Sequence, residues 1–185
     1  TVPSEFFEAR DLLMKEVEWT EARTGKRPAK LEVGVMLETP ALAFSLSELA
    51  GEVDFLSVGT NDLMQFFFAA DRMTPSVSDR YDLVSPAGMR FLKKVSEDCA
   101  ALSIQMSACG EATASPLSAL CFVALGFHAL SMPAAAIGPV KRMVRSLDLG
   151  AFRSDFLKVL DAPDDAFRNQ VLALAADHKV ELSND

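Results

Sequence analysis

The chain has 185 residues, of which 50% are hydrophobic and 24% are charged, a composition typical of a globular protein and not of a disordered one. It carries 26 Asp and Glu against 18 Lys and Arg, and the resulting net charge of -8 argues against nucleic acid or an anionic membrane as the main partner. No apolar run approaches the ~18–20 residues of a membrane span, so no membrane-spanning segment is expected.

The predicted elements alternate between helix and strand. A first helix is predicted over residues 4–24, capped by Ser4 and with an apolar face expected to be buried. Four strands follow, at residues 31–37, 53–58, 104–108 and 129–132. The other predicted helices cover residues 40–49, 63–70, 86–102, 116–125, 133–147, 151–160 and 164–180. This alternation predicts an α/β fold with parallel strands and right-handed crossovers.

The number of strands limits the architecture. A complete eight-unit barrel needs about 250 residues, whereas this sequence predicts only four strands. We therefore expect about half of a TIM-type barrel over residues 1–148 and a helical extension of the same domain over residues 149–185. The chain begins at Thr1 rather than Met, and we expect it to be a fragment of a longer protein.

Few cysteines and histidines are present. Cys99, Cys109 and Cys121 show no CxxC spacing, so neither a disulfide framework nor a zinc site is indicated, and a reducing, cytoplasmic setting is the simplest interpretation. The two histidines, His128 and His178, argue against most histidine-based metal sites and against a Ser-His-Asp hydrolase.

Polar side chains follow three of the predicted strands. Glu38 follows the first strand, Asn61 and Asp62 follow the second, and Cys109 ends the third, at the edge where α/β barrels place their sites. Two converging carboxylates repel each other unless a cation offsets their charge, and Mg²⁺ is commonly held by one or two carboxylates together with substrate phosphate oxygens. Arg72 follows in the same loop as Asp62 and has the planar donor geometry that suits phosphate.

Each candidate also has an ordinary structural interpretation. Glu38 suits a solvated strand end or a helix cap, and Asn61 and Asp62 are common turn residues. Arg72 suits a solvated loop, and Cys109 suits a small buried side chain.

Four segments in register carry a resemblance to a known family. They are VGVMLETPAL, VDFLSVGTNDLMQFFFAADR, SACGEATASP and ALSMPAAAIGPVK. With them the sequence resembles the C-terminal phosphoenolpyruvate (PEP)-binding barrel of the PEP-utilising enzymes, most closely enzyme I of the phosphotransferase system in its nitrogen-branch form. The resemblance implies the C-terminal half of a (β/α)8 barrel. One departure is Ser85 before Pro86, where the family usually has a histidine.

The resemblance implies a role for each candidate residue. Glu38 and Asp62 match magnesium ligands, Asn61 and Asp62 match residues at the bound PEP, and Arg72 matches an arginine that holds the phosphate. Cys109 matches the acid that protonates the enolate carbon. The family's further phosphate-binding arginines and its phospho-accepting histidine match no segment of this chain, so the chain alone is expected to be inactive.

The resemblance also implies an activity for the parent protein. It would be a cytoplasmic, magnesium-dependent enzyme that transfers phosphate from PEP to a histidine and then to an HPr-type phosphocarrier, releasing pyruvate. The bare edges of strands 31–37 and 129–132 predict a homodimer, as does the family. Two alternatives remain open: a magnesium-dependent aldolase or lyase acting on pyruvate enolates, and a non-catalytic dimerisation module.

Overall fold

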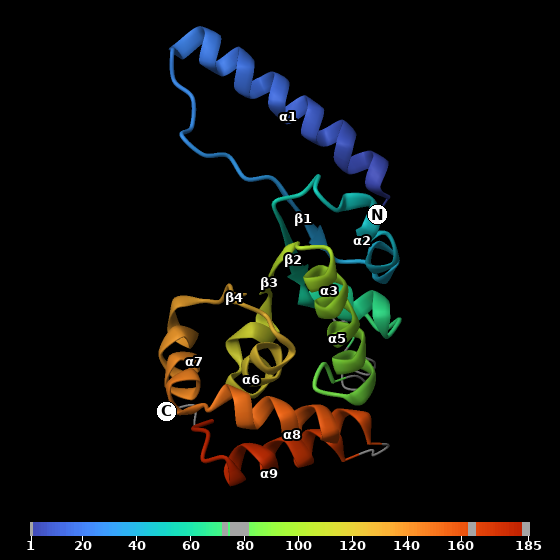
Figure 1. Cartoon of the computed structure of the whole chain (residues 1–185), viewed down its shortest axis with the longest axis vertical. Coiled ribbons are helices and arrows are strands. Elements are labelled where there is room, and N and C mark those ends of the chain that lie inside the picture. The colour runs from blue at the N-terminus through green and yellow to red at the C-terminus, as the bar shows by residue number, and fades with distance from the viewer. Residues whose placement is uncertain (1, 72–73, 75–81, 163–165, 183–185) are drawn as a thin grey trace.

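The core of the protein is a parallel sheet of four strands (Figure 1). The computed structural model describes residues 2–71, 74, 82–162 and 166–182. The strands are β1 (Gly34–Leu37), β2 (Phe55–Gly59), β3 (Gln105–Cys109) and β4 (Ala129–Leu130). They are adjacent in the order of the sequence, and all three pairings are parallel. This confirms the α/β class and the partial barrel, followed by C-terminal helices.

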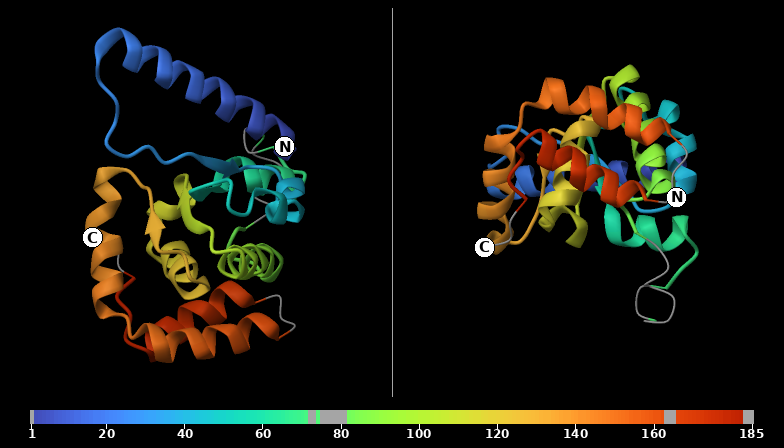
Figure 2. Two further views of the ribbon diagram at one scale, coloured as in Figure 1. Left: turned by 45° about the horizontal axis from the view of Figure 1, so that its top comes forward. Right: turned by 90° about the horizontal axis from the view of Figure 1, so that it is seen from below.

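The helices stand between and after the strands. They are α1 (Pro3–Thr24), the 3-10 helix η1 (Pro40–Phe44), α2 (Leu46–Leu49), α3 (Thr60–Phe67), α5 (Pro86–Ala101), the 3-10 helix η2 (Glu111–Ala114), α6 (Pro116–Leu125), α7 (Ala134–Ser146), α8 (Leu149–Asp161) and α9 (Phe167–Asp177). Figures 1 and 2 show α8 and α9 side by side, with α5 and α6 between this pair and the sheet. Among the described residues, no helix is long and apolar enough to cross a membrane.

The two faces of the sheet differ because side chains alternate along each strand. Leu56, Val58 and Ala108 are fully buried and belong to the same hydrophobic core as the apolar side chains of α5 and α6. Phe55 and Ser57 point to the opposite face, where Phe55 is 38% exposed. The sheet therefore has one face covered by helices and one open face.

Helix α1 departs from the expectation of a buried face. Its N-cap is Val2 and not Ser4, and Pro3 is its one buried residue. Trp19 is 55% exposed, and the helix extends away from the sheet (Figure 1). The guanidinium of Arg10 forms a salt bridge with the Glu52 carboxylate at 2.6 Å, and this contact connects the first half of α1 to the rest of the domain. The apolar pattern identified a face, but no described element covers most of it.

Two shorter segments also differ from the prediction. Residues 40–49 form η1 and α2 in succession instead of one helix. The polar segment that starts at Thr60 is the first turn of α3 and not a loop before it. This second difference moves Asn61 and Asp62 onto a rigid element directly after β2.

Candidate functional site at the carboxyl ends of the strands

The candidate site begins with three residues side by side at the ends of β1, β2 and β3. Gly59 pairs with Cys109, and Glu38 follows Leu37, which pairs with Val58. Glu38, Gly59 and Cys109 therefore form one row across three adjacent strands. The sheet itself thus brings together two of the predicted residues, with a glycine between them.

Gly59 leaves room that a side chain would fill. A Cβ atom at this position would lie 2.8 Å from Cγ of Glu38, closer than real Cβ atoms pack, and 3.2 Å from Sδ of Met36, which is tighter than most real Cβ contacts. Glu38 consequently lies directly over the backbone of β2. Because Gly59 has no side chain, the Glu38 side chain can lie over it in the row that also contains Cys109.

Asn61 and Asp62 lie in the first turn of α3, next to this row. A carboxylate in the first turn of a helix is favoured by the helix dipole, which suits Asp62. The Oδ1 atom of Asn61 accepts a hydrogen bond from the Glu111 backbone N–H at 3.1 Å. Because this oxygen is occupied, the amide offers its N–H groups, which are donors suited to an anionic ligand.

Buried threonines hold the strand ends in register. The Thr60 hydroxyl donates to the Cys109 carbonyl at 2.9 Å and joins α3 to the end of β3. The Thr113 hydroxyl lies 2.7 Å from the Gly110 carbonyl oxygen and 2.6 Å from that of Ser131, which joins the ends of β3 and β4. Both side chains are almost completely buried. The sequence analysis missed them, although threonines inside GTND and GEAT segments at strand ends are a visible signal.

Gly110 turns the chain between Cys109 and η2. Its φ of +111° is a conformation that residues with a side chain rarely adopt, and an added Cβ would clash with the Thr60 hydroxyl and the Asn61 amide. The resemblance implies a PEP site here, so we expect Gly110→Ala to weaken PEP binding by the full-length protein about tenfold or more, because strain of about 1–3 kcal/mol would displace Asn61. Titration calorimetry with PEP measures this loss.

Gly138→Ala is the matched control for Gly110→Ala. Gly138 lies inside α7, and a Cβ there would meet no atom within 4 Å. Alanine favours a helix interior, so this variant should bind PEP as the wild type does. Equal binding by both variants would contradict the role given to Gly110.

The three cysteines lie in different environments. Burial raises the pKa of the Cys99 thiol to about 11 and that of the Cys121 thiol to about 12, so both remain protonated at neutral pH. Cys109 is half-buried on the open face of the sheet. Of the three thiols, it alone combines access with a place among the predicted site residues.

The carboxylates of Glu38 and Asp62 could hold a metal ion. Oxygen donors of this type suit Mg²⁺, which keeps several water or phosphate ligands and needs only one or two protein carboxylates. Within the described ranges there is no cluster of three or more acidic, histidine or cysteine side chains that would form a closed metal site. Two carboxylates are the number of protein ligands that Mg²⁺ commonly has when it shares its coordination with a substrate. Arg72, the predicted phosphate ligand, lies outside the described residues.

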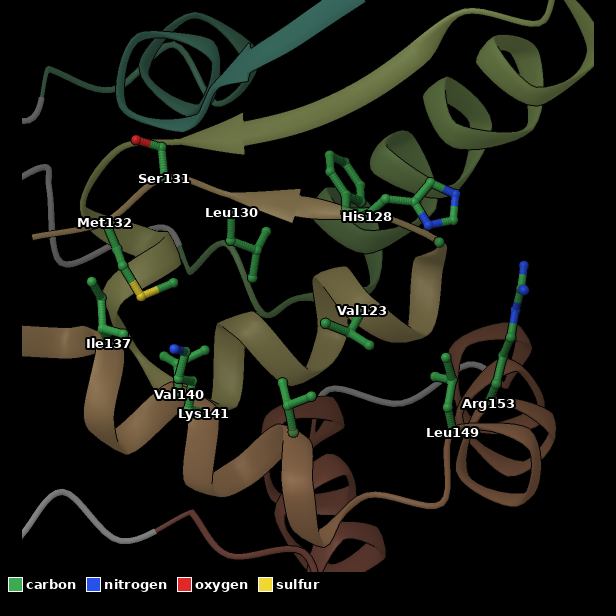
Figure 3. A pocket seen from close by; sticks show the side chains of 13 residues that line it. Val123, His128, Leu130, Ser131, Met132, Ile137, Val140, Lys141, Leu149 and Arg153 are labelled. Carbon is green, nitrogen blue, oxygen red and sulfur yellow. The ribbon is translucent and has the colours of Figure 1, made fainter. Parts of the chain in front are cut away.

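A separate cavity lies beside β4, away from Glu38, Asp62 and Cys109. Its volume is about 770 Å³, and side chains from α7 and from the β4 segment line it, among them Leu130, Met132 and Val140 (Figure 3). Arg153 and His128 stand at one end of it (Figure 3). None of the predicted site residues that the structure describes lines this cavity, which follows the edge of the sheet at β4.

Comparisons with known proteins identify the family of the chain. Residues 1–149 match the family model described as the PEP-binding domain of PEP-utilising enzymes. The chain is 35% identical over 141 residues to the phosphoenolpyruvate-dependent phosphotransferase system protein of Salmonella typhimurium, over 76% of the chain and 19% of that relative. It is 38% identical over 132 residues to the phosphoenolpyruvate-protein phosphotransferase of Borreliella burgdorferi, over 71% of the chain and 23% of the relative.

A third relative extends the match. The phosphoenolpyruvate-protein phosphotransferase of Listeria monocytogenes is 34% identical over 145 residues, which is 78% of the chain and 25% of the relative. The chain thus spans a quarter or less of the length of these curated relatives.

Proposed function

Because the chain belongs to the PEP-utilising enzymes and matches their PEP-binding domain, we propose that it forms the PEP site of a PEP-protein phosphotransferase. The observation that carries this proposal is the row of Glu38, Gly59 and Cys109, with Asn61 and Asp62 beside it. These residues offer two carboxylates, an amide and a thiol at the carboxyl ends of three adjacent strands. The relatives bear the name of this activity, and the same reaction is proposed here.

The carboxylates and the amide would bind the anionic end of PEP. A Mg²⁺ ion held by Glu38 and Asp62 would offset the negative charge of the phosphate and of the developing enolate oxygen. The Asn61 amide, fixed by the Glu111 N–H, would donate to the substrate. Arg72 would donate to the phosphate in a planar, paired geometry.

Cys109 would supply the proton that completes the reaction. As the phosphate moves to a histidine nitrogen, the bond between phosphorus and the enol oxygen breaks and leaves the enolate of pyruvate. The enolate's carbon–carbon π electrons then take the proton from the Cys109 thiol, and the carbonyl of pyruvate forms. Sulfur keeps the electron pair of the S–H bond as a thiolate, so a proton from solvent must later restore the thiol.

The remaining parts of the reaction lie in other domains of the parent. We propose that the accepting histidine belongs to another domain, that an HPr-type carrier receives the phosphate next, and that the enzyme works in the cytoplasm. His128 precedes β4 at its amino end, and His178 follows α9 and contacts Asp155 and Phe152 of α8.

Calorimetry tests the proposed site. The full-length protein, titrated with PEP in the presence of Mg²⁺ and again in EDTA, should bind PEP only when the metal is present. The 185-residue chain, titrated in parallel, shows how much of the affinity this part contributes. Metal-independent binding by the full-length protein would contradict the roles given to Glu38 and Asp62.

We further propose that the isolated chain self-associates. Each outer strand, β1 and β4, has one unpaired edge within the sheet, and an apolar cavity follows the edge of β4. Light scattering coupled to size exclusion should give at least twice the monomer mass of 20.0 kDa. A monomer at micromolar concentration with a cooperative melt would overturn this proposal.

A further inference from the structure

Ser57 contacts the thiol of Cys109 from the neighbouring strand. Its Oγ atom donates a hydrogen bond to Cys109 Sγ at 3.5 Å. Ser57 pairs with Ser107 in the parallel register, so Cys109 lies diagonally across from it, two residues further along β3. Ser57 therefore lies two residues before Gly59 in β2, and its hydroxyl reaches diagonally to the sulfur atom in β3.

Packing alone does not account for a serine at this position. The neighbours of Ser57 in β2 are apolar, and Leu56 and Val58 point into the core while Ser57 points to the open face. A half-buried hydroxyl loses hydration and needs a hydrogen-bond partner. In the part of the chain that the structure describes, the Ser57 hydroxyl has Cys109 as its side-chain hydrogen-bond partner.

We propose that Ser57 is a positioning residue for the Cys109 thiol, an inference that rests on the proposed function. Because sulfur accepts the Ser57 hydrogen bond through a lone pair, its own S–H bond points away from Ser57 and remains available to donate the proton. When the proton leaves, sulfur becomes a thiolate, and a hydrogen bond to a charged acceptor is roughly twice as strong as one to a neutral acceptor. Ser57 thus stabilises the transition state of proton transfer more than the bound substrate.

Ser107 provides a matched comparison in the same sheet. It lies opposite Ser57, on the same face and in the same row. Its hydroxyl donates to the Leu56 carbonyl at 3.5 Å and not to the thiol. Removing this hydroxyl perturbs the sheet to a similar degree without touching Cys109.

The test is the exchange of pyruvate methyl protons with D₂O, catalysed by the full-length protein with Mg²⁺ and followed by proton NMR. Exchange reverses the proton step: the Cys109 thiolate takes a methyl proton, the C–H electron pair enters the enolate, and the thiol exchanges with solvent before returning a deuteron. It needs no phosphate transfer. We expect Ser57→Ala to slow exchange about 10- to 100-fold, the scale of a hydrogen bond to a charged group, with unchanged PEP affinity.

Two further variants separate the effect of the Ser57 hydroxyl from the effect of side-chain shape. Thr and Val have nearly the same shape, so Ser57→Thr should retain most of the exchange rate and Ser57→Val should lose it. This pair decides the question even where Ser57→Ala unfolds. Ser107→Ala should exchange at the wild-type rate.

The outcomes distinguish this inference from the proposed function. Wild-type exchange by Ser57→Val, or equal slowing by Ser107→Ala, overturns the role of Ser57 and leaves Cys109 as the acid. Wild-type exchange by Cys109→Ala overturns the assignment of the acid, and with it the role of Ser57. Loss of PEP affinity in Ser57→Val would instead make Ser57 a binding residue.

Discussion

Asp62→Ala in the full-length protein is expected to lower magnesium-dependent PEP turnover by about a thousandfold or more. Asp62 is one of two carboxylates proposed to hold Mg²⁺. Such an ion stabilises the charge that develops in the transition state by several kcal/mol, and this stabilisation would be lost with the metal. The residue occupies the first turn of α3, where β2 fixes its position. Steady-state turnover of PEP, measured across a range of Mg²⁺ concentrations, gives both the loss and its metal dependence.

Two variants complete the Asp62 experiment. Asp62→Asn keeps the shape of the side chain and removes its charge, so it should be nearly as inactive as alanine. Asp177→Ala removes an exposed carboxylate at the end of α9 and should leave turnover unchanged. Turnover by Asp62→Ala equal to the wild type at limiting Mg²⁺ would rule out Asp62 as a metal ligand.

The place of the site was predictable because it follows from topology. Parallel strands end at one edge of a sheet, so Glu38, Asp62 and Cys109 had to approach one another once four strands were assigned. The row of Glu38, Gly59 and Cys109 was not predictable, since it depends on which residues pair across β1, β2 and β3. The contact of Ser57 with Cys109 depends on the same register.

Other features depended on neighbours that a local pattern does not specify. The apolar residues of α1 predicted a buried face, yet Leu13 is 39% exposed because no described element packs over that part of the helix. Asn61 and Asp62 read as a turn since both residues are common in turns and in the first turns of helices alike. In the structure Gly59 is the N-cap and α3 begins at Thr60, so both residues belong to a helix and not to a turn.

Cys109→Ala in the full-length protein should slow net transfer of phosphate from PEP by roughly a hundredfold or more, with PEP affinity largely intact. The reason is that a positioned general acid contributes about 10²–10⁴-fold, whereas the groups proposed to bind the phosphate are Arg72 and the Mg²⁺ ion and not the thiol. Rapid-quench measurement of the phosphohistidine gives the rate, and calorimetry with PEP and Mg²⁺ gives the affinity.

The other thiols and a serine variant make this test specific to proton donation. Cys99→Ala removes a buried thiol whose pKa is raised to about 11, so any slowing by that variant reports packing and not acid catalysis. Cys109→Ser keeps the size of the side chain but replaces the thiol with a hydroxyl, a far weaker acid, and should be nearly as slow as alanine. If PEP affinity collapsed in Cys109→Ala while the transfer rate survived, Cys109 would be a binding residue, and the proton would have to come from another group or from water.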